Sequence, residues 1–124
     1  MSLKNLAADG YTSASPASLP EGVLFVSATW CPHCQATKPE MQVAAQTLGS
    51  VVPVFVVDSE RNAAVIAGLR RFKGYPTIYY NDKSKLTEYS GPRKGRYIAD
   101  WACGLSGKCP ARGAGGRGGS LGWR

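Results

Sequence analysis

Two cysteines separated by two residues are the feature of this 124-residue sequence that most directly predicts chemistry. They lie in the segment Trp30-Cys31-Pro32-His33-Cys34, after a short apolar run and at the predicted start of a helix. A helix N-terminus offers free backbone N–H groups and the positive end of the helix dipole, and both favour a thiolate over a thiol. We therefore predict that Cys31 is a nucleophile of low pKa and that Cys34, one helical turn later, is the resolving thiol.

The two residues between the cysteines, Pro32 and His33, bear on the direction of the reaction. His33 can offer an N–H or a positive charge to the Cys31 thiolate, which stabilises the reduced form. A more stable reduced form makes the disulfide form a stronger oxidant. The Pro-His pair therefore favours disulfide formation or isomerisation over disulfide reduction.

The elements that would position these cysteines alternate between buried strands and amphipathic helices, a pattern typical of an α/β domain. Pro39 should kink the first helix, and residues 3–9 are compatible with either an edge strand or a turn of helix. The last helix should bury Tyr97, Ile98 and Trp101. The predicted elements are strands at 23–27 and 53–58, helices at 32–48, 60–72 and 94–103, and a hairpin of 77–80 with 86–89.

The positive charge of the chain is concentrated at its C-terminal end. The whole sequence has 15 Lys and Arg against 8 Asp and Glu, or +7. Residues 1–92 hold 8 basic and 7 acidic side chains (+1), whereas residues 93–124 hold 7 basic and one acidic side chain (+6). Eight of the 15 glycines lie between Gly104 and Gly122. We therefore predict one domain over 1–103 and a flexible Gly/Arg-rich tail over 104–124.

Around the cysteine pair the sequence resembles the thioredoxin superfamily, and within it most closely the catalytic domain of protein disulfide isomerases. The resemblance covers about residues 20–102. Besides the cysteine motif it rests on Pro39, on KGYPTI (73–78), which is similar to the family segment with a cis-proline, and on EYSGPR (88–93). It implies a thioredoxin fold, in which a central mixed β-sheet is flanked by helices.

The resemblance also implies roles for residues outside the cysteine motif. Pro76 would be the cis-proline that faces the dithiol, and the main chain of Tyr75 would pair with an unfolded substrate. Trp30 would pack beside the nucleophile and shape the contact surface. Arg93 aligns with an arginine that can approach the site and favour deprotonation of Cys34.

Two departures from the family pattern stand out. Phe25 lies six residues before Cys31, where the family usually has a buried acid that accepts a proton from the resolving thiol. The CPHC sequence is that of bacterial periplasmic disulfide oxidases, which carry a large helical insertion before the cis-proline. Only 41 residues separate Cys34 from Pro76, so such an insertion does not fit here.

Cys103 and Cys109 flank the short glycine-containing segment GLSGK and leave several alternatives open. They can form a structural disulfide, remain two free thiols, or act as a second dithiol that exchanges electrons with Cys31 and Cys34. For Cys31 and Cys34 the alternative hypotheses are an inert disulfide or half of a zinc site. Because zinc needs two further ligands at suitable spacing, we expect redox chemistry and no metal.

Together these observations predict a monomeric thiol-disulfide oxidoreductase with no cofactor beyond its own CPHC dithiol, leaning to disulfide oxidase or isomerase activity. Its partners would be protein thiols and disulfides and a redox partner protein or glutathione. One alternative is a general thioredoxin-like disulfide reductase. Another is a basic adaptor whose tail arginines (Arg112, Arg117 and Arg124) bind acidic partners or RNA, although we do not expect nucleic-acid binding from so few arginines.

The sequence also bears on membranes and compartment. No stretch approaches the roughly 18 apolar residues that suggest a membrane span, so we expect no membrane association. The first 20 residues contain no continuous apolar segment of the kind found in secretory signals. The expected location is therefore cytoplasmic, or the secretory pathway and ER lumen if the sequence is that of a processed form.

Overall fold

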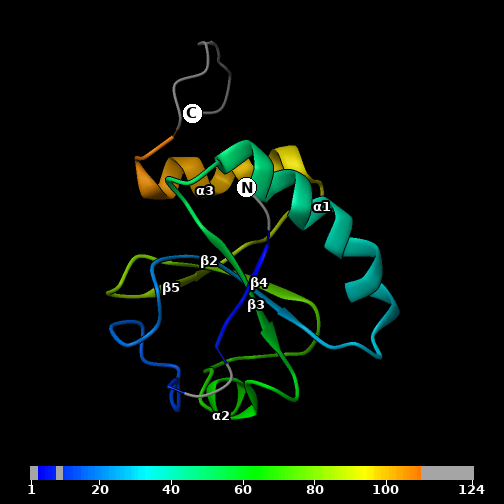
Figure 1. Ribbon diagram of the computed structural model, residues 1–124, viewed down its shortest axis with the longest axis vertical. Coiled ribbons are helices and arrows are strands. Elements are labelled where there is room, and N and C mark those ends of the chain that lie inside the picture. Colours follow the sequence, from blue (N-terminus) through cyan, green and yellow to red (C-terminus); the bar gives the residue numbers. More distant parts are fainter. Residues whose placement is uncertain (1–2, 8–9, 110–124) are drawn as a thin grey trace.

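Five strands form one mixed β-sheet with the order β1-β3-β2-β4-β5 (Figure 1). The computed structural model describes residues 3–7 and 10–109. In chain order the elements are β1 (Lys4–Asn5), β2 (Gly22–Ser27), α1 (Pro32–Leu48), β3 (Val54–Asp58), α2 (Ala63–Ala67), β4 (Thr77–Asn81), β5 (Leu86–Glu88) and α3 (Gly95–Ser106). The predicted α/β class and the order of elements from residue 23 are confirmed, and the open question at residues 3–9 is resolved as a short edge strand.

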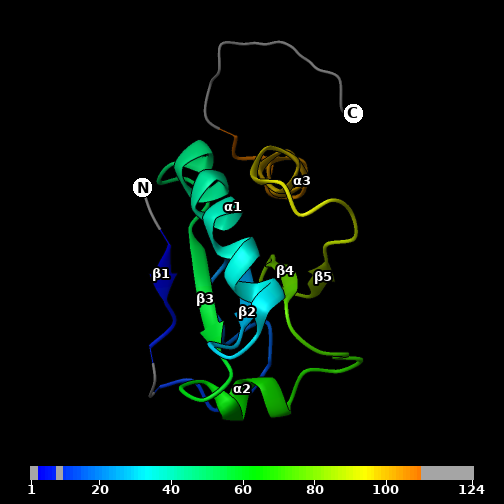
Figure 2. The ribbon, with the colours of Figure 1, turned by 90° about the vertical axis from the view of Figure 1, so that its right-hand side faces the viewer.

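The sheet separates two hydrophobic layers. Helices α1 and α3 cover one face, and α2 lies on the other (Figures 1 and 2). The larger core contains Val23, Phe25, Met41, Ala44, Ala45, Leu48, Val52, Val54, Ile78, Tyr80, Ile98, Ala99 and Ala102. The smaller core contains Leu6, Leu19, Leu24, Val26, Val57, Val65 and Tyr79. Neighbouring strand residues alternate between the two cores, as the two-residue period of a strand requires.

Strand β2 lies at the centre of the sheet and determines where the cysteine motif is placed. It pairs with β3 in parallel and with β4 in antiparallel orientation. The C-terminal ends of β2 and β3 therefore lie at the same edge as the start of β4. The register pairs Ser27 with Asp58 on one side of β2 and Val26 with Thr77 on the other. Helix α1 begins five residues after β2, so its N-terminus lies at this edge.

Helix α2 is much shorter than the predicted helix over 60–72. The carboxylate of Asp58 accepts hydrogen bonds from the backbone nitrogens of Glu60 and Arg61 at 2.9 and 3.0 Å, which holds residues 58–61 in a turn. The helix ends at Gly68, and Arg71 has a φ of 60°, in the left-handed region. A helix is therefore present within the predicted range, but the turn before it and the change of backbone after it limit it to five residues.

Helix α3 extends three residues beyond its predicted end, through Gly104 to Ser106. Gly107 provides the left-handed C-cap, with its N–H donated to the Cys103 carbonyl at 3.0 Å. The prediction that Tyr97 belongs to the core is wrong, because this residue is 48% exposed. It falls outside the helix face that Ile98 presents to the core, and the Arg96 guanidinium lies 5.7 Å from its ring centre.

The predicted flexible tail falls mostly outside the described residues, which end at Cys109. The arginines on which the adaptor alternative depends, Arg112, Arg117 and Arg124, all lie there. The extent of the domain and of the tail therefore stays a prediction. Within the described ranges, no helix has the length and apolarity required to cross a membrane.

Candidate active site

Cys31 is the N-cap residue of α1, as the position of the cysteine motif predicts. Its extended backbone (φ −97°, ψ 114°) lets its sulfur accept a hydrogen bond from the backbone nitrogen of Cys34 at 3.2 Å. Pro32 occupies the first position of the helix, where a missing N–H costs no intrahelical hydrogen bond. The helix continues through Pro39 to Leu48, so the predicted bounds of this element are confirmed. Both cysteine thiols are free and buried.

The surroundings shift the pKa values of the two thiols in opposite directions. Burial raises the pKa of Cys31, but hydrogen bonds from the Cys34 thiol and from the backbone N–H groups of Cys34 and His33, with the charge of Arg93, lower it below its ordinary value. Burial raises the pKa of Cys34, and the hydrogen bond to Cys31 raises it further. The surroundings thus favour ionisation of Cys31, at the helix cap, over ionisation of Cys34, one turn inside.

The segment that precedes β4 lies directly against Cys31. The Tyr75–Pro76 peptide bond is cis, and the Cys31 thiol donates to the Tyr75 carbonyl oxygen at 3.8 Å. The Tyr75 ring packs edge-on against Trp30 and Phe72, with ring centres 5.4 and 5.2 Å away. Trp30 is 63% exposed, so an open aromatic surface adjoins the nucleophile.

Arg93 and His33 lie at different distances from the chemistry. Arg93 is exposed and lines a groove of about 400 Å³ together with Pro76. Its charge lowers the pKa of Cys31. A role of Arg93 in the deprotonation of Cys34, which the family resemblance implies, stays a prediction. The side chain of His33 is exposed, and its backbone N–H contributes to the stabilisation of Cys31. A tuning role of the imidazole stays a prediction.

The surroundings of Cys34 include two residues, Ser27 and Asp58, that were not predicted from the sequence. Phe25 is fully buried in the larger core and offers no acceptor for a proton. The side chain of Ser27, at the end of β2, lowers the pKa of the Cys34 thiol, against the larger effect of burial. Asp58 is paired with Ser27 in the neighbouring strand. The available signal was positional, because both residues end parallel strands at the edge where α/β sheets place their sites.

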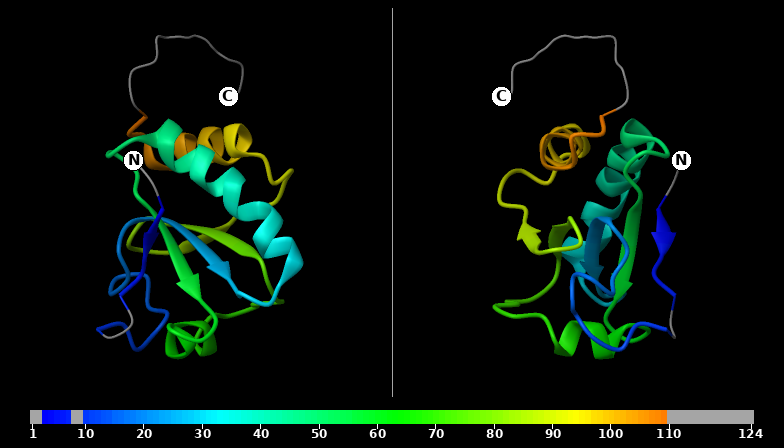
Figure 3. Two further views of the ribbon diagram at one scale, coloured as in Figure 1. Left: turned by 45° about the vertical axis from the view of Figure 1, so that its right-hand side comes forward. Right: turned by 90° about the vertical axis from the view of Figure 1, so that its left-hand side faces the viewer.

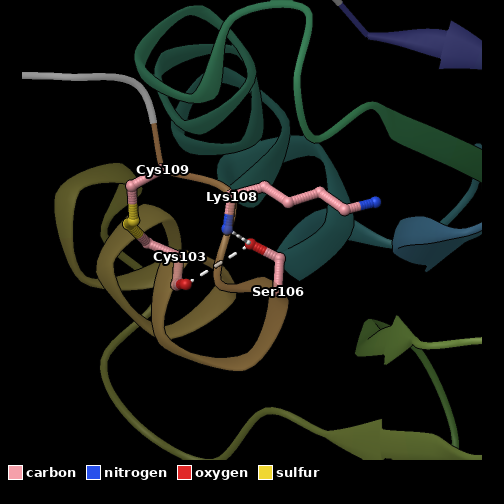
Figure 4. Close-up of a disulfide and its surroundings, with 4 residues drawn as sticks. All are labelled: Cys103, Ser106, Lys108 and Cys109. Carbon is pink, nitrogen blue, oxygen red and sulfur yellow. Dashed lines mark hydrogen bonds between the residues drawn. A yellow bond between two sulfur atoms is a disulfide. The ribbon is translucent and has the colours of Figure 1, made fainter.

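Cys103 and Cys109 form a disulfide at the C-terminal end of α3, with their Cα atoms 5.0 Å apart (Figure 4). Ser106 links the two sides of this loop, since its hydroxyl donates to the Cys103 carbonyl at 3.3 Å and accepts from the Lys108 backbone nitrogen at 3.0 Å. The structure therefore has these two cysteines joined and not as two free thiols. A structural role for the disulfide stays a prediction.

The disulfide and the dithiol lie at opposite ends of the molecule. Figures 1 and 3 show the start of α1 (cyan) and the end of α3 (orange) far apart. Helix α1 has 17 residues and is therefore about 25 Å long. Within the part of the chain that the structure describes, no three His, Cys, Asp or Glu side chains come together as metal ligands.

Comparison with known proteins gives relatives that share this part of the chain. Protein disulfide-isomerase 1 of Caenorhabditis elegans is 39% identical over 83 residues, which are 64% of this chain and 17% of that protein. Protein disulfide-isomerase A2 of Homo sapiens is 37% identical over 82 residues, which are 60% of this chain and 15% of that protein. The matched region thus represents about a sixth of the length of these relatives.

Solved structures share the fold. The zinc-bound form of human ERp44 matches with a TM-score of 0.66 at 20% identity, covering 84% of this chain and 31% of that one. The J-Trx1 fragment of ERdj5 matches with a TM-score of 0.66 at 14% identity, covering 84% and 51%. The predicted thioredoxin fold with a mixed sheet is therefore confirmed. The family model described as Thioredoxin matches residues 8–103, and the chain belongs to the thioredoxin family.

Proposed function

We propose that this chain is a thiol-disulfide oxidoreductase that acts on protein thiols and disulfides through Cys31 and Cys34. The observation that carries the proposal is the position of the Cys31 sulfur. It accepts a hydrogen bond from the Cys34 backbone nitrogen at 3.2 Å and lies beside the Tyr75 carbonyl oxygen. A stabilised thiolate next to an open segment of main chain is the arrangement that disulfide exchange requires. The named activity of the disulfide-isomerase relatives supports the same chemistry.

In the proposed reaction Cys31 attacks a disulfide of the substrate and forms a mixed disulfide, which Cys34 then resolves. The oxidised Cys31–Cys34 pair runs the same steps in reverse and forms a disulfide in the substrate. An extended substrate chain would lie against Tyr75 and Pro76 and contact the exposed ring of Trp30. Main-chain pairing of this kind requires no particular sequence, which suits unfolded or partly folded proteins as substrates. A redox partner protein or glutathione would restore the starting state of the dithiol.

The direction we propose is disulfide formation or isomerisation. The lowered pKa of Cys31 stabilises the reduced form and makes the Cys31 sulfur a better leaving group from the mixed disulfide. Equilibration of the Cys31–Cys34 pair with glutathione tests this. We expect a potential nearer to about −180 or −120 mV, the values of disulfide isomerases and oxidases. A potential near about −270 mV would assign the chain to the reductases.

Substitution of each cysteine tests the site itself. Cys31→Ser should abolish turnover of a model protein disulfide, and Cys34→Ser should accumulate a mixed disulfide with the substrate that mass spectrometry detects. Cys109→Ser is the matched control, because it removes a cysteine at the opposite end of the molecule. Turnover that survives Cys31→Ser would disprove the assignment.

A further inference from the structure

The resolving step requires a group near Cys34 that can accept the proton of its thiol. Burial and the hydrogen bond to Cys31 raise the pKa of Cys34, so its thiol is protonated at neutral pH and must lose a proton before its sulfur can attack. Phe25, fully buried in the adjacent core, cannot accept that proton. A proton acceptor must therefore come from another element at this edge of the sheet.

The ends of β2 and β3 bring a hydroxyl and a carboxylate side by side below the start of α1. Ser27 and Asp58 are direct partners in the parallel ladder, and neighbouring strands lie about 4.8 Å apart. Val23 and Phe25 of β2, like Val54 of β3, pack into the core beneath α1 and α3. The two-residue period places Ser27 and Asp58 on that same face.

The contacts of these two side chains fit a path for a proton. The side chain of Ser27 acts on the Cys34 thiol and lowers its pKa, against the larger effect of burial. The two backbone hydrogen bonds that Asp58 accepts, from Glu60 and Arg61, both go to Oδ2, so Oδ1 has no hydrogen bond from the described residues. The carboxylate is half-buried, between the strand edge and the turn that follows.

The charges around this edge are also consistent with the path. Asp58 and Cys34 both raise the pKa of the Tyr75 phenol, after the larger effect of its burial, so the three groups share one electrostatic environment. The charge of Cys31 also acts on Cys34, and the charge of Arg93 acts on Cys31. Asp58 thus lies beside Ser27, whose side chain in turn acts on the resolving thiol.

We propose that Asp58 is the proton acceptor for Cys34 and that the Ser27 hydroxyl carries the proton between them. This inference rests on the proposed function. Cys31 attacks the substrate disulfide, whose S–S bond breaks to release the first substrate thiolate. The Cys34 thiol then passes its proton to Ser27, which passes its own proton to Asp58.

The electrons and bonds of the resolving step balance without any further reactant. The sulfur of Cys34 forms a bond with the sulfur of Cys31, and the bond between Cys31 and the substrate breaks. The second substrate sulfur leaves with the electron pair and takes up a proton from solvent. The substrate disulfide gains two electrons, and the dithiol becomes a disulfide. Asp58 returns its proton to solvent and needs no other group for this.

Single-turnover kinetics with dithiobis(nitrobenzoate) separate the two steps, because attack by Cys31 releases one coloured thiolate and resolution by Cys34 releases a second. Asp58→Asn is the main variant. It keeps an oxygen that can accept from Glu60 and Arg61 but removes the base. Ser27→Ala removes the carrier. Glu60→Gln and Ser59→Ala are matched controls, since they alter a carboxylate and a hydroxyl within two residues of Asp58.

We expect the second phase at pH 7 to slow by about tenfold or more in Asp58→Asn and in Ser27→Ala, with the first phase changed by less than about twofold. The pH profile is the decisive readout. In the unmodified protein the second phase should be level around neutral pH, because Asp58 and not hydroxide accepts the proton. In Asp58→Asn it should rise with hydroxide, by about tenfold per pH unit. Both controls should resemble the unmodified protein.

Three results would overturn the inference. These are an unchanged pH profile in Asp58→Asn, an unchanged second phase in Ser27→Ala, or an equal loss in Ser59→Ala. Circular dichroism of each variant verifies that the fold is intact, and Asp58→Glu should retain a level profile. Failure of the proposed function would look different, because the first phase would then be absent or insensitive to Cys31→Ser.

Discussion

The sulfur of Cys31 and the backbone nitrogen of Cys34 are 3.2 Å apart, so the peptide N–H of one cysteine stabilises the thiolate of the other. This contact exists because Cys31 caps the helix that contains Cys34. A free N–H in the first turn needs an acceptor, and a thiolate is a strong one. The two cysteines are therefore unequal before any substrate binds.

Cys31 should react with iodoacetamide at a lower pH than an ordinary thiol, whose pKa is about 8.5. Burial opposes ionisation, but the hydrogen bonds from Cys34 and His33 and the charge of Arg93 outweigh it. Because the folded pKa lies below the unfolded one, this thiolate stabilises the reduced fold above the unfolded pKa. That contribution disappears as the pH falls through the folded pKa.

The alkylation rate measured across pH, with the labelled cysteine identified by mass spectrometry, checks this expectation. Cys34 should be labelled only at higher pH, since its pKa is raised by burial and by Cys31. Cys34→Ala should move the apparent pKa of Cys31 upward, because it removes the thiol hydrogen bond. Equal labelling of both cysteines across the pH range would contradict the assigned roles.

Arg93→Gln should raise the apparent pKa of Cys31, because the positive charge that favours the thiolate is lost. Arg93 is exposed, so the difference should shrink as salt is added and the Debye length falls to about 10 Å at 0.1 M. Arg96→Gln removes the same charge from the first turn of α3 and is the control. If both variants shift the pKa equally, the effect comes from net charge and not from the position of Arg93.

Trp30→Ala should weaken the interaction with unfolded protein substrates while leaving the alkylation profile of Cys31 unchanged. The ring is 63% exposed and packs edge-on against Tyr75, so it offers aromatic surface beside the dithiol. A loss of about 1 kcal/mol of contact would raise KM about fivefold. Val51→Ala, which trims an exposed apolar residue outside the site, should leave KM as it is. A changed alkylation profile would instead indicate that Trp30 supports the cap.

Gly95→Ala should lower the free energy of unfolding by about 1–3 kcal/mol. A Cβ at this position would lie 2.7 Å from the Glu40 carbonyl oxygen and from the Val43 side chain, where α3 starts against α1. Gly104→Ala is the matched control in the same helix. It is exposed and should raise the free energy by about 0.5–1 kcal/mol. Urea titration measures both, and a neutral effect of Gly95→Ala would show that the two helices can move apart.

Cys109→Ser should lower the free energy of unfolding by about 2 kcal/mol, because it opens a loop that a disulfide closes over a sequence separation of six. Cys109 itself is exposed, so the substitution removes little besides the cross-link. The rate of disulfide exchange by Cys31 should not change, since the disulfide closes the C-terminal end of α3, which lies far from the start of α1. A slower exchange would revive the hypothesis of a second dithiol that communicates with the first.

Much of the fold follows from the sequence because its determinants are local. The apolar runs at 23–27 and 53–58, the helical period after Cys31 and the glycine at position 49 each act within a few residues, and the resulting elements are present. Helices α2 and α3 differ from their predicted bounds because of local signals. Asp58 holds a turn where the helical period alone predicts the start of α2, and α3 continues until Gly107 adopts the left-handed cap.

For the site, the sequence by itself determined the cysteine pair and its position at a helix N-terminus. Only the tertiary structure decided what faces it. The contact of Cys31 with Tyr75 joins residues 44 positions apart, and the pairing of Ser27 with Asp58 depends on strand register. Such contacts depend on how packed elements meet across the whole core. Helix capping depends on a few neighbouring residues, and this is why the sequence specified the position of Cys31 but not its surroundings.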